Sequence, residues 1–340
     1  MTDWRIFRNT RTPHDSIDGL PPPPPWRPFR SGPVESDRAI PADNDLPKSM
    51  QHRGRTFHAD DVIQNTVNAA LILRRPILVT GNPGTGKSSL IDAIAYELRL
   101  GEPLRWAVTS RSTLRDALYS YDAVGRLQAT QQARSQANEG QPIATVSMTP
   151  FLRLGPLGTA LTPTNRPWAL LVDEIDKADL DLPNDLLNVL EEGEFEIPEL
   201  ARLDENTAHV RLHGNTETTH PVTGGRVRAR QFPVVVFTSN GEREFPPAFL
   251  RRCLRLEMPD ATKDVDRLTS IVRAHLTSYF ENKALAAEIE TRIRTFVNRA
   301  ATERLATDQL LGALLLVVGR EGIPPEQRDS LARLVTPPLA

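Results

Sequence analysis

Residues 81–88 are Gly81-Asn-Pro-Gly-Thr-Gly-Lys87-Ser88, which matches the phosphate-binding loop pattern of two glycines separated by four residues and followed by Lys and Ser. An apolar run at residues 76–80 precedes this loop and predicts a buried parallel strand. Residues 88–98 follow it with apolar side chains at helical spacing. Strand, loop and helix in this order allow backbone amides at the helix N-terminus to bind phosphate oxygens.

Each residue type in this loop suits one part of a nucleoside triphosphate. Glycine allows the backbone to turn tightly and to approach phosphate oxygens closely. Lys87 would neutralise the β and γ phosphates of ATP, and the Ser88 hydroxyl would bind Mg²⁺. The residues assigned to nucleotide binding are Gly81, Asn82, Pro83, Gly84, Thr85, Gly86, Lys87, Ser88 and Ser89.

Two carboxylates follow a second apolar run. Leu170-Leu-Val-Asp173-Glu174 predicts a buried strand that ends in Asp173 and Glu174. A lone Asp-Glu pair at a strand end often only caps a helix. In the same parallel sheet as a phosphate loop, however, Asp173 would hold Mg²⁺ and Glu174 would polarise the water that attacks ATP.

A third apolar run, at residues 233–238, ends close to Asn240. The side-chain amide of Asn240 could hold the attacking water between the loop and the carboxylates. The alternative is that Asn240-Gly241 is only a turn, which this dipeptide favours. Because the other two sites accompany it, we expect Asn240 to be functional.

Strand and helix signals alternate as far as about residue 260. Further strands are expected at residues 104–109 and 168–172, which together with the helical segments predicts an α/β fold with a parallel sheet. After residue 260 only helical spacing remains. We therefore expect three parts: a proline-rich extended tail at 1–50, a nucleotide-binding α/β domain at 51–260 and a helical domain at 261–340.

Composition narrows the class of protein. The 340 residues can bury a sizeable core, and the single cysteine, Cys253, excludes a disulfide framework and a cysteine zinc site and favours a cytoplasmic location. The formal net charge of -2 gives no overall attraction to nucleic acid or anionic lipid. The longest apolar stretch, residues 310–319, is too short to span a bilayer, so no membrane association is expected.

In this order and spacing, the motifs resemble those of a MoxR-type AAA+ ATPase over roughly residues 50–335. Val172-Asp-Glu-Ile-Asp-Lys, followed by Leu186-Leu-Asn-Val-Leu-Glu-Glu-Gly-Glu-Phe, resembles the Walker B region and the next helix of that family. Pro246-Pro-Ala-Phe-Leu-Arg-Arg resembles its arginine-finger segment. The resemblance implies a P-loop AAA+ three-layer α/β domain with a parallel sheet and a small all-α lid, and ATP sites at the interfaces of a homo-oligomeric ring, typically a hexamer.

The resemblance also assigns arginines to the γ-phosphate. Arg252, with Arg251 as the alternative, would contact the γ-phosphate bound to a neighbouring subunit, although arginines at a helix end usually cap carbonyls or pair with surface acids. Relatives often carry Ser-Pro-Arg at the start of a lid helix, whereas Thr307-Asp308-Gln309 occupies that place here. The lid residue that would contact the γ-phosphate therefore stays open, and Arg304 is one substitute for the family's arginine.

The first fifty residues hold ten of the 29 prolines, five of them in the run at 21–25. Such a run is either a solvated leader or a preformed helix that docks on an aromatic groove of a partner or of its own domain. Trp4, the proline run and the Arg53-Gly-Arg-Thr-Phe segment together resemble a bacterial branch encoded beside von Willebrand factor A proteins in proposed conflict systems. That narrower resemblance implies a protein partner with a von Willebrand factor A domain.

Residues 205–231 predict a β-hairpin in which Arg226, Arg228 and Arg230 share one face. That face could contact DNA or an acidic protein, but charges on an edge strand commonly only prevent aggregation, which is the interpretation we favour. Histidines in the same segment, His209, His213 and His220, lack the Cys or carboxylate neighbours of a metal site.

Three functions remain open from the sequence. The first is an ATP-hydrolysing ring that remodels or assembles a partner protein complex, which the family resemblance supports. The second is a motor or loader that acts on DNA, for which the arginine hairpin is the only support. The third is a nucleotide-gated switch with little turnover, which the unusual lid sequence permits.

Overall fold

The computed structural model describes residues 4–27, 38–136, 146–203, 207–214, 218–318 and 323–338. The helices are α1 Lys48–Thr56, α2 Asp61–Leu73, α3 Ser89–Glu97, α4 Leu114–Leu118, α5 Ala123–Gln136, α6 Pro156–Ala160, α7 Leu182–Glu192, α8 Pro198–Ala201, α9 Pro247–Arg252, α10 Val265–His275, α11 Lys283–Ala300, α12 Thr307–Val317 and α13 Pro325–Val335. The strands are β1 Ile77–Thr80, β2 Leu104–Ala107, β3 Tyr119–Tyr121, β4 Leu152–Leu154, β5 Ala169–Asp173, β6 Glu194–Glu196, β7 Thr207–Arg211, β8 Thr219–Thr223, β9 Arg226–Arg228, β10 Val234–Ser239 and β11 Leu254–Glu257.

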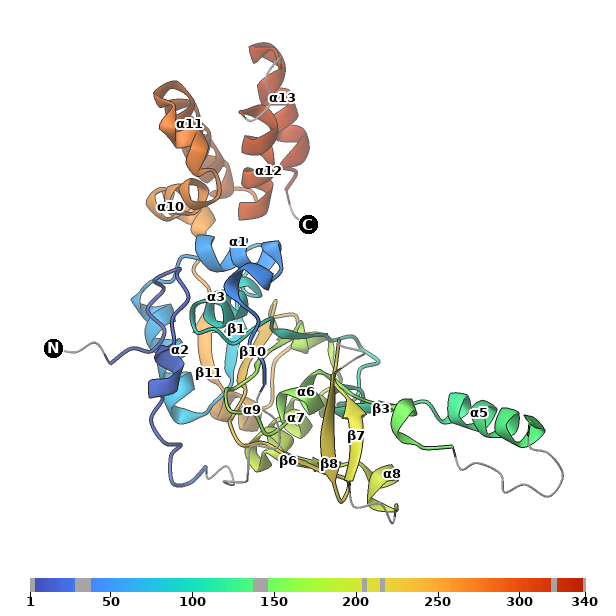
Figure 1. Ribbon diagram of the computed structural model, residues 1–340. Coiled ribbons are helices and arrows are strands. Elements are labelled where there is room, and N and C mark those ends of the chain that lie inside the picture. Colours follow the sequence, from blue (N-terminus) through green and yellow to red (C-terminus); the bar gives the residue numbers. More distant parts are fainter. Residues whose placement is uncertain are drawn as a thin grey trace.

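Five parallel strands form the central sheet in the order β11-β1-β10-β5-β2 (Figure 1). Successive side chains face opposite sides of the sheet, so Ile77 and Val79 belong to one apolar core and Leu78 to the other. Helices α2 and α3 cover the first face, and α6, α7 and α9 pack on the second. The predicted three-layer α/β fold is therefore confirmed.

Four of the five central strands were predicted from apolar runs. The fifth, β11, was missed because Leu-Arg-Leu-Glu alternates apolar and charged residues, as expected for a strand at the sheet edge. Its neighbour β1 lies in the interior of the sheet, so its Ile-Leu-Val sequence is buried on both sides.

The strand order brings the sequence motifs together at the carboxyl ends of the parallel strands. Strand β10 lies between β1 and β5, and Thr80 pairs with Ser239 while Phe237 pairs with Val172. The phosphate loop follows β1, the carboxylates end β5 and Asn240 follows β10. All three motifs therefore meet at one edge of the sheet.

A second sheet, of order β3-β4-β7-β8-β9-β6, contains the predicted arginine hairpin. Strand β9 pairs with the acidic strand β6, so Arg226 lies opposite Glu196 and Arg228 opposite Glu194. The ion-pair distances are 3.2 Å from Arg226 Nε to Glu196 Oε2 and 2.9 Å from Arg228 Nε to Glu194 Oε2. Two of the three arginines of the expected basic face are thus paired across the strands, and β9 lies between β8 and β6 rather than at the sheet edge, where the favoured interpretation placed it. Residues 205, 206 and 215–217 of the predicted hairpin lie outside the described residues.

Helix α5 extends away from the second sheet in Figure 1. Residues 137–145 lie outside the described residues. No side chain of α5 is buried, so the rest of the domain contributes little to holding this helix.

Helices α10 to α13 form the small all-α domain predicted after residue 260. Helices α10, α11 and α12 contribute to an apolar core that includes Leu268, Ile289, Phe296 and Leu314. In Figure 1 these helices stack beyond the sheet domain, and α1 lies between the two parts. In the described part of the chain, no helix combines the length and apolar character needed to cross a membrane.

The N-terminal segment, residues 4–27, packs on the sheet domain and is not the free extended tail that its proline content suggested. Ile6 and Phe7 are buried in the core on the α2–α3 side. Asn68 of α2 is fully buried, and its Oδ1 accepts hydrogen bonds from the backbone amides of Ile6 at 2.7 Å and Phe7 at 2.9 Å. These bonds satisfy backbone groups that burial would otherwise leave unpaired. Residues 28–37 lie outside the described residues.

Candidate nucleotide-binding site

The loop between β1 and α3 turns at three glycines. Gly81, Gly84 and Gly86 have φ angles of 143°, 75° and 84°, which residues with a Cβ rarely adopt. Lys87 is only 8% exposed, and its Nζ donates hydrogen bonds to the carbonyl oxygens of Gly81 at 2.7 Å and Asn82 at 3.0 Å. Burial lowers the pKa of the Lys87 ammonium, and nearby carboxylates oppose that shift.

The Asp173 carboxylate joins the phosphate loop to two strands of the sheet. Its Oδ1 accepts hydrogen bonds from Ser88 Oγ at 2.8 Å and from Thr238 Oγ1 at 2.5 Å. The Thr238 hydroxyl also accepts a bond of 2.9 Å from the backbone amide of Glu174. The structure thus brings Ser88 and Asp173 together as expected. Thr238 was missed, because a threonine within an apolar strand gives no separate sequence signal.

Glu174 has a strained backbone and two polar neighbours. Its φ of 58° is left-handed, a conformation that costs a non-glycine residue about 1 kcal/mol or more and is often found in functional sites. Lys177 Nζ lies 2.6 Å from Glu174 Oε2, and this hydrogen bond raises the pKa of Lys177. Asn240 Nδ2 lies 3.5 Å from Glu174 Oε1, so the amide and the carboxylate face each other as expected.

Asp176 fixes the loop that carries Asn240. The Asp176 side chain is nearly fully buried, and its Oδ2 accepts hydrogen bonds from the backbone amides of Asn240 at 2.9 Å and Glu242 at 3.1 Å. Its other oxygen, Oδ1, is also buried and lacks a hydrogen-bond partner among the described residues. Asp176 belongs to the Asp-Glu-Ile-Asp motif, but its role could not be predicted from the sequence, because its partners lie more than sixty residues away in the chain.

A cavity of about 190 Å³ lies between the phosphate loop and the helical lid. The loop residues 84–86 form one end of it, and Phe57, Ile271 and Leu311 provide apolar walls. Arg53 and Arg267 also line it, whereas Arg304 is exposed and does not. A polar, glycine-rich end beside apolar walls suits a nucleotide, because its phosphates are charged and its aromatic base can pack against apolar side chains.

The lid contacts the loop directly. A Cβ placed on Gly84 would lie 2.6 Å from Ala306 Cβ and 2.9 Å from Asp308 Oδ1, distances that no real Cβ tolerates. Gly84 therefore permits the close approach of α12 as well as the turn of the loop. An acidic side chain, Asp308, thus lies beside the phosphate loop.

The two candidate finger arginines differ in their surroundings. Arg252 Nε pairs with Glu191 Oε1 at 3.1 Å within the same chain, whereas Arg251 is exposed and forms no ion pair within the described residues. The Arg75 guanidinium donates to the backbone carbonyls of Arg251, Arg252 and Cys253 at the end of α9. Arg75 thereby satisfies carbonyls that a helix end leaves unpaired and holds the backbone that carries both arginines.

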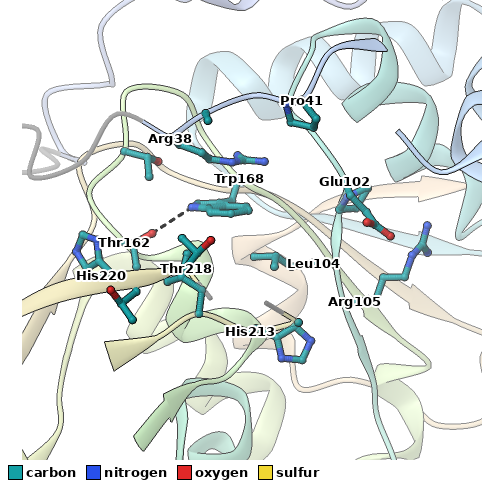
Figure 2. Close-up of a pocket in the computed structure, with 16 residues that line it drawn as sticks. Arg38, Pro41, Glu102, Leu104, Arg105, Thr162, Trp168, His213, Thr218 and His220 are labelled. Atoms are coloured by element: carbon teal, nitrogen blue, oxygen red, sulfur yellow. Dashed lines mark hydrogen bonds between the residues drawn. The ribbon is translucent and has the colours of Figure 1, made fainter. Parts of the chain in front are cut away.

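A larger cavity, of about 790 Å³, lies elsewhere, beside the edge strand β2 (Figure 2). There the Arg38 guanidinium stacks 3.4 Å from the centre of the Trp168 ring, and Trp168 Nε1 donates to Thr162 Oγ1 at 3.1 Å. His213 and His220 also line it, and burial lowers the pKa of His220 to about 4. No group of three potential metal ligands occurs within the described residues. We therefore place the functional site at the smaller cavity, which the phosphate loop lines; the hydrogen bond from Ser88 to Asp173 joins that loop to the carboxylates.

A family model described as AAA domain (dynein-related subfamily) matches residues 76–253, just over half of the chain. The chain belongs to this family. The match begins just before β1 and ends just after α9, so it includes the phosphate loop, both carboxylates, Asn240 and the arginine pair.

Solved structures similar to this AAA domain chain include NtrX from Brucella abortus. The ADP complex of NtrX is 13% identical in sequence, with a TM-score of 0.36, and the match covers 83% of this chain and 53% of that chain. The ATP complex is 14% identical, with a TM-score of 0.32, and the match covers 86% of this chain and 51% of that chain. The chain spans about half the length of these structures. No curated protein gives a significant match.

The position of Asp308 generates a prediction for the AAA domain and its lid. Replacing Asp308→Asn should tighten ATP binding by about two- to fivefold at low salt, because a carboxylate near the phosphate loop repels the triphosphate. Asp329→Asn, on the exposed face of α13, is the matched control and should leave affinity unchanged. Isothermal titration with ATP measures both; equal affinity for wild type and Asp308→Asn would contradict this interpretation.

Proposed function

We propose that this chain is a MoxR-type AAA+ ATPase that binds and hydrolyses ATP and acts as a homo-oligomeric ring, typically a hexamer, to remodel a partner protein complex. The observation that carries the proposal is the hydrogen bond from Ser88 to Asp173, together with Thr238 and the neighbouring Glu174. It joins a phosphate loop to paired carboxylates at one edge of a parallel sheet, the arrangement that ATP hydrolysis requires.

The polar groups at this edge fit Mg²⁺. The Ser88 hydroxyl and the Asp173 carboxylate share a hydrogen bond, so two hard oxygen ligands already face one another beside the phosphate loop. Few protein ligands are needed, since Mg²⁺ at such sites also binds phosphate oxygens and water. When bound, the ion neutralises charge on the β and γ phosphates.

Glu174 and Asn240 would carry the hydrolytic step. Glu174 would accept a proton from the attacking water, and Asn240 would orient that water from the opposite side of the carboxylate. Asp176 supports this geometry indirectly, because it holds the backbone amides of the Asn240 loop. Lys87 would contact the β and γ phosphates.

A ring would complete the site with an arginine from the next subunit. The sequence favoured Arg252, but its ion pair with Glu191 occupies that guanidinium within its own chain. Arg251 is exposed and lies at the same helix end, which Arg75 holds in place. We therefore assign the finger to Arg251, whose planar guanidinium can bind phosphate oxygens without losing its proton.

Lid movement would then act on a protein partner in the cytoplasm. The narrower resemblance, to the branch encoded beside von Willebrand factor A proteins, implies that this partner contains a von Willebrand factor A domain. The DNA-acting alternative loses its support, because Glu194 and Glu196 pair with two of the three arginines on which it depended. A switch with little turnover keeps one specific observation in its favour, the acidic Asp308 beside the phosphate loop. Stimulation of hydrolysis by DNA, and its loss at high salt, would distinguish a DNA motor from a protein remodeller.

Removing the proposed base tests hydrolysis separately from binding. Glu174→Gln should lower kcat for ATP by at least about a hundredfold while ATP affinity stays within about twofold, because the amide cannot accept the proton. Glu192→Gln, an exposed residue of α7, should behave as wild type. Phosphate release and ATP titration give the two readouts. Undiminished hydrolysis in Glu174→Gln refutes the assignment, and wild-type protein that binds ATP without turnover favours the switch.

The arginine assignment predicts complementation between subunits. Arg251→Ala should lower kcat by about a thousandfold, whereas Arg252→Ala should retain most activity. Mixing inactive Arg251→Ala with inactive Glu174→Gln should restore part of the hydrolysis, because Glu174→Gln subunits supply the finger to intact neighbouring sites. No recovery on mixing, or equal losses in the two arginine variants, would contradict Arg251 as the finger.

A further inference from the structure

The path of the N-terminal segment (residues 4–27) is fixed by polar contacts with α3 as well as with α2. The buried Glu97 carboxylate accepts hydrogen bonds from the backbone amides of Arg8 at 2.7 Å and Arg11 at 3.3 Å, and lies 3.2 Å from His14 Nε2. A buried carboxylate needs such partners, so releasing the segment would leave Glu97 unpaired in the core. The segment is therefore a fixed part of the domain surface.

The end of this segment lies beside the arginine-bearing helix α9. Arg27 Nη2 lies 3.2 Å from Glu191 Oε1, the same oxygen that pairs with Arg252 Nε at 3.1 Å. Arg27 Nη1 also donates to the carbonyl oxygen of Arg74 at 2.5 Å. Arg74 Nη2 in turn donates to the carbonyl oxygen of Pro21 at 2.6 Å, so both ends of the proline run are held.

One large apolar side chain is left exposed at this place. Trp26 is 75% exposed, although the neighbouring Arg27 is held on both sides. Pro21, Pro22 and Pro25 next to it are exposed as well. An exposed tryptophan on a fixed backbone buries a large area in an interface at little entropic cost, which is why this residue is common at interface centres.

We infer that Trp26 and the adjoining proline run are part of the contact surface for a second copy of this chain in the ring. The inference rests on the proposed function, because the finger has to reach a neighbouring subunit. Arg251 and Arg252 end the same helix, and the Arg27–Glu191–Arg252 ion pairs hold Trp26 next to it. A neighbour that receives Arg251 at its phosphate site therefore also lies close to Trp26.

Assembly of the full chain tests this contact. Sedimentation velocity with ATP, in the Glu174→Gln background to prevent turnover, should show that Trp26→Ala needs at least about tenfold more protein than its parent for half-maximal assembly. Trp4→Ala is the matched control, since Trp4 is 56% exposed at the other end of the same segment. It should assemble like the parent. Both variants should keep the parent's ATP affinity, because neither side chain lines the nucleotide cavity.

A second readout follows the indole itself. In the Trp4→Ala chain, assembly should shift the tryptophan emission to shorter wavelength as Trp26 becomes buried, and the additional Trp26→Ala change should abolish that shift. Equal assembly of Trp26→Ala and Trp4→Ala, with no emission shift, overturns the inference and leaves the ring intact. A parent protein that stays monomeric with ATP at every concentration overturns the ring itself, and the inference with it.

Discussion

The hydrogen bonds that meet at Asp173 Oδ1 are the interaction on which the rest of this structure depends. Ser88 donates from the start of α3 and Thr238 donates from β10, so one carboxylate oxygen connects the phosphate loop with two strands. Two charge-assisted bonds of this kind are each stronger than bonds between neutral groups. The Thr238 hydroxyl also accepts a hydrogen bond from the backbone amide of Glu174, so the same contacts fix the backbone position of Glu174.

The central sheet places the phosphate loop and the arginine pair at opposite ends of its strands. Strand β1, Ile77–Thr80, begins just after Arg75, which holds the end of α9, and ends just before Gly81, which begins the phosphate loop. Since β1 is buried on both faces, the distance between these ends is fixed by packing. The phosphate loop and the end of α9 are therefore held at a constant spacing.

The local motifs could be predicted from the sequence because their chemistry depends on neighbouring residues: the glycines and Lys87 in the loop, and Asp173 after an apolar strand. The partners that support them could not, since Thr238 and Asp176 acquire their contacts only through the strand order. The N-terminal segment was misjudged for a related reason, because its prolines favour an extended chain. Asn68, far away in the sequence, supplies the buried hydrogen bonds that hold that chain in place.

The ATP affinity of the Lys87→Ala variant shows whether the loop at residues 81–88 binds a triphosphate. If this loop binds a triphosphate, isothermal titration should show micromolar binding for the wild type. The affinity of Lys87→Ala should be lower by at least about a hundredfold, because the buried ammonium would contact the β and γ phosphates. Lys283→Ala, at the exposed start of α11, should bind like wild type. Equal affinity in all three proteins, or no binding by the wild type, would contradict the account.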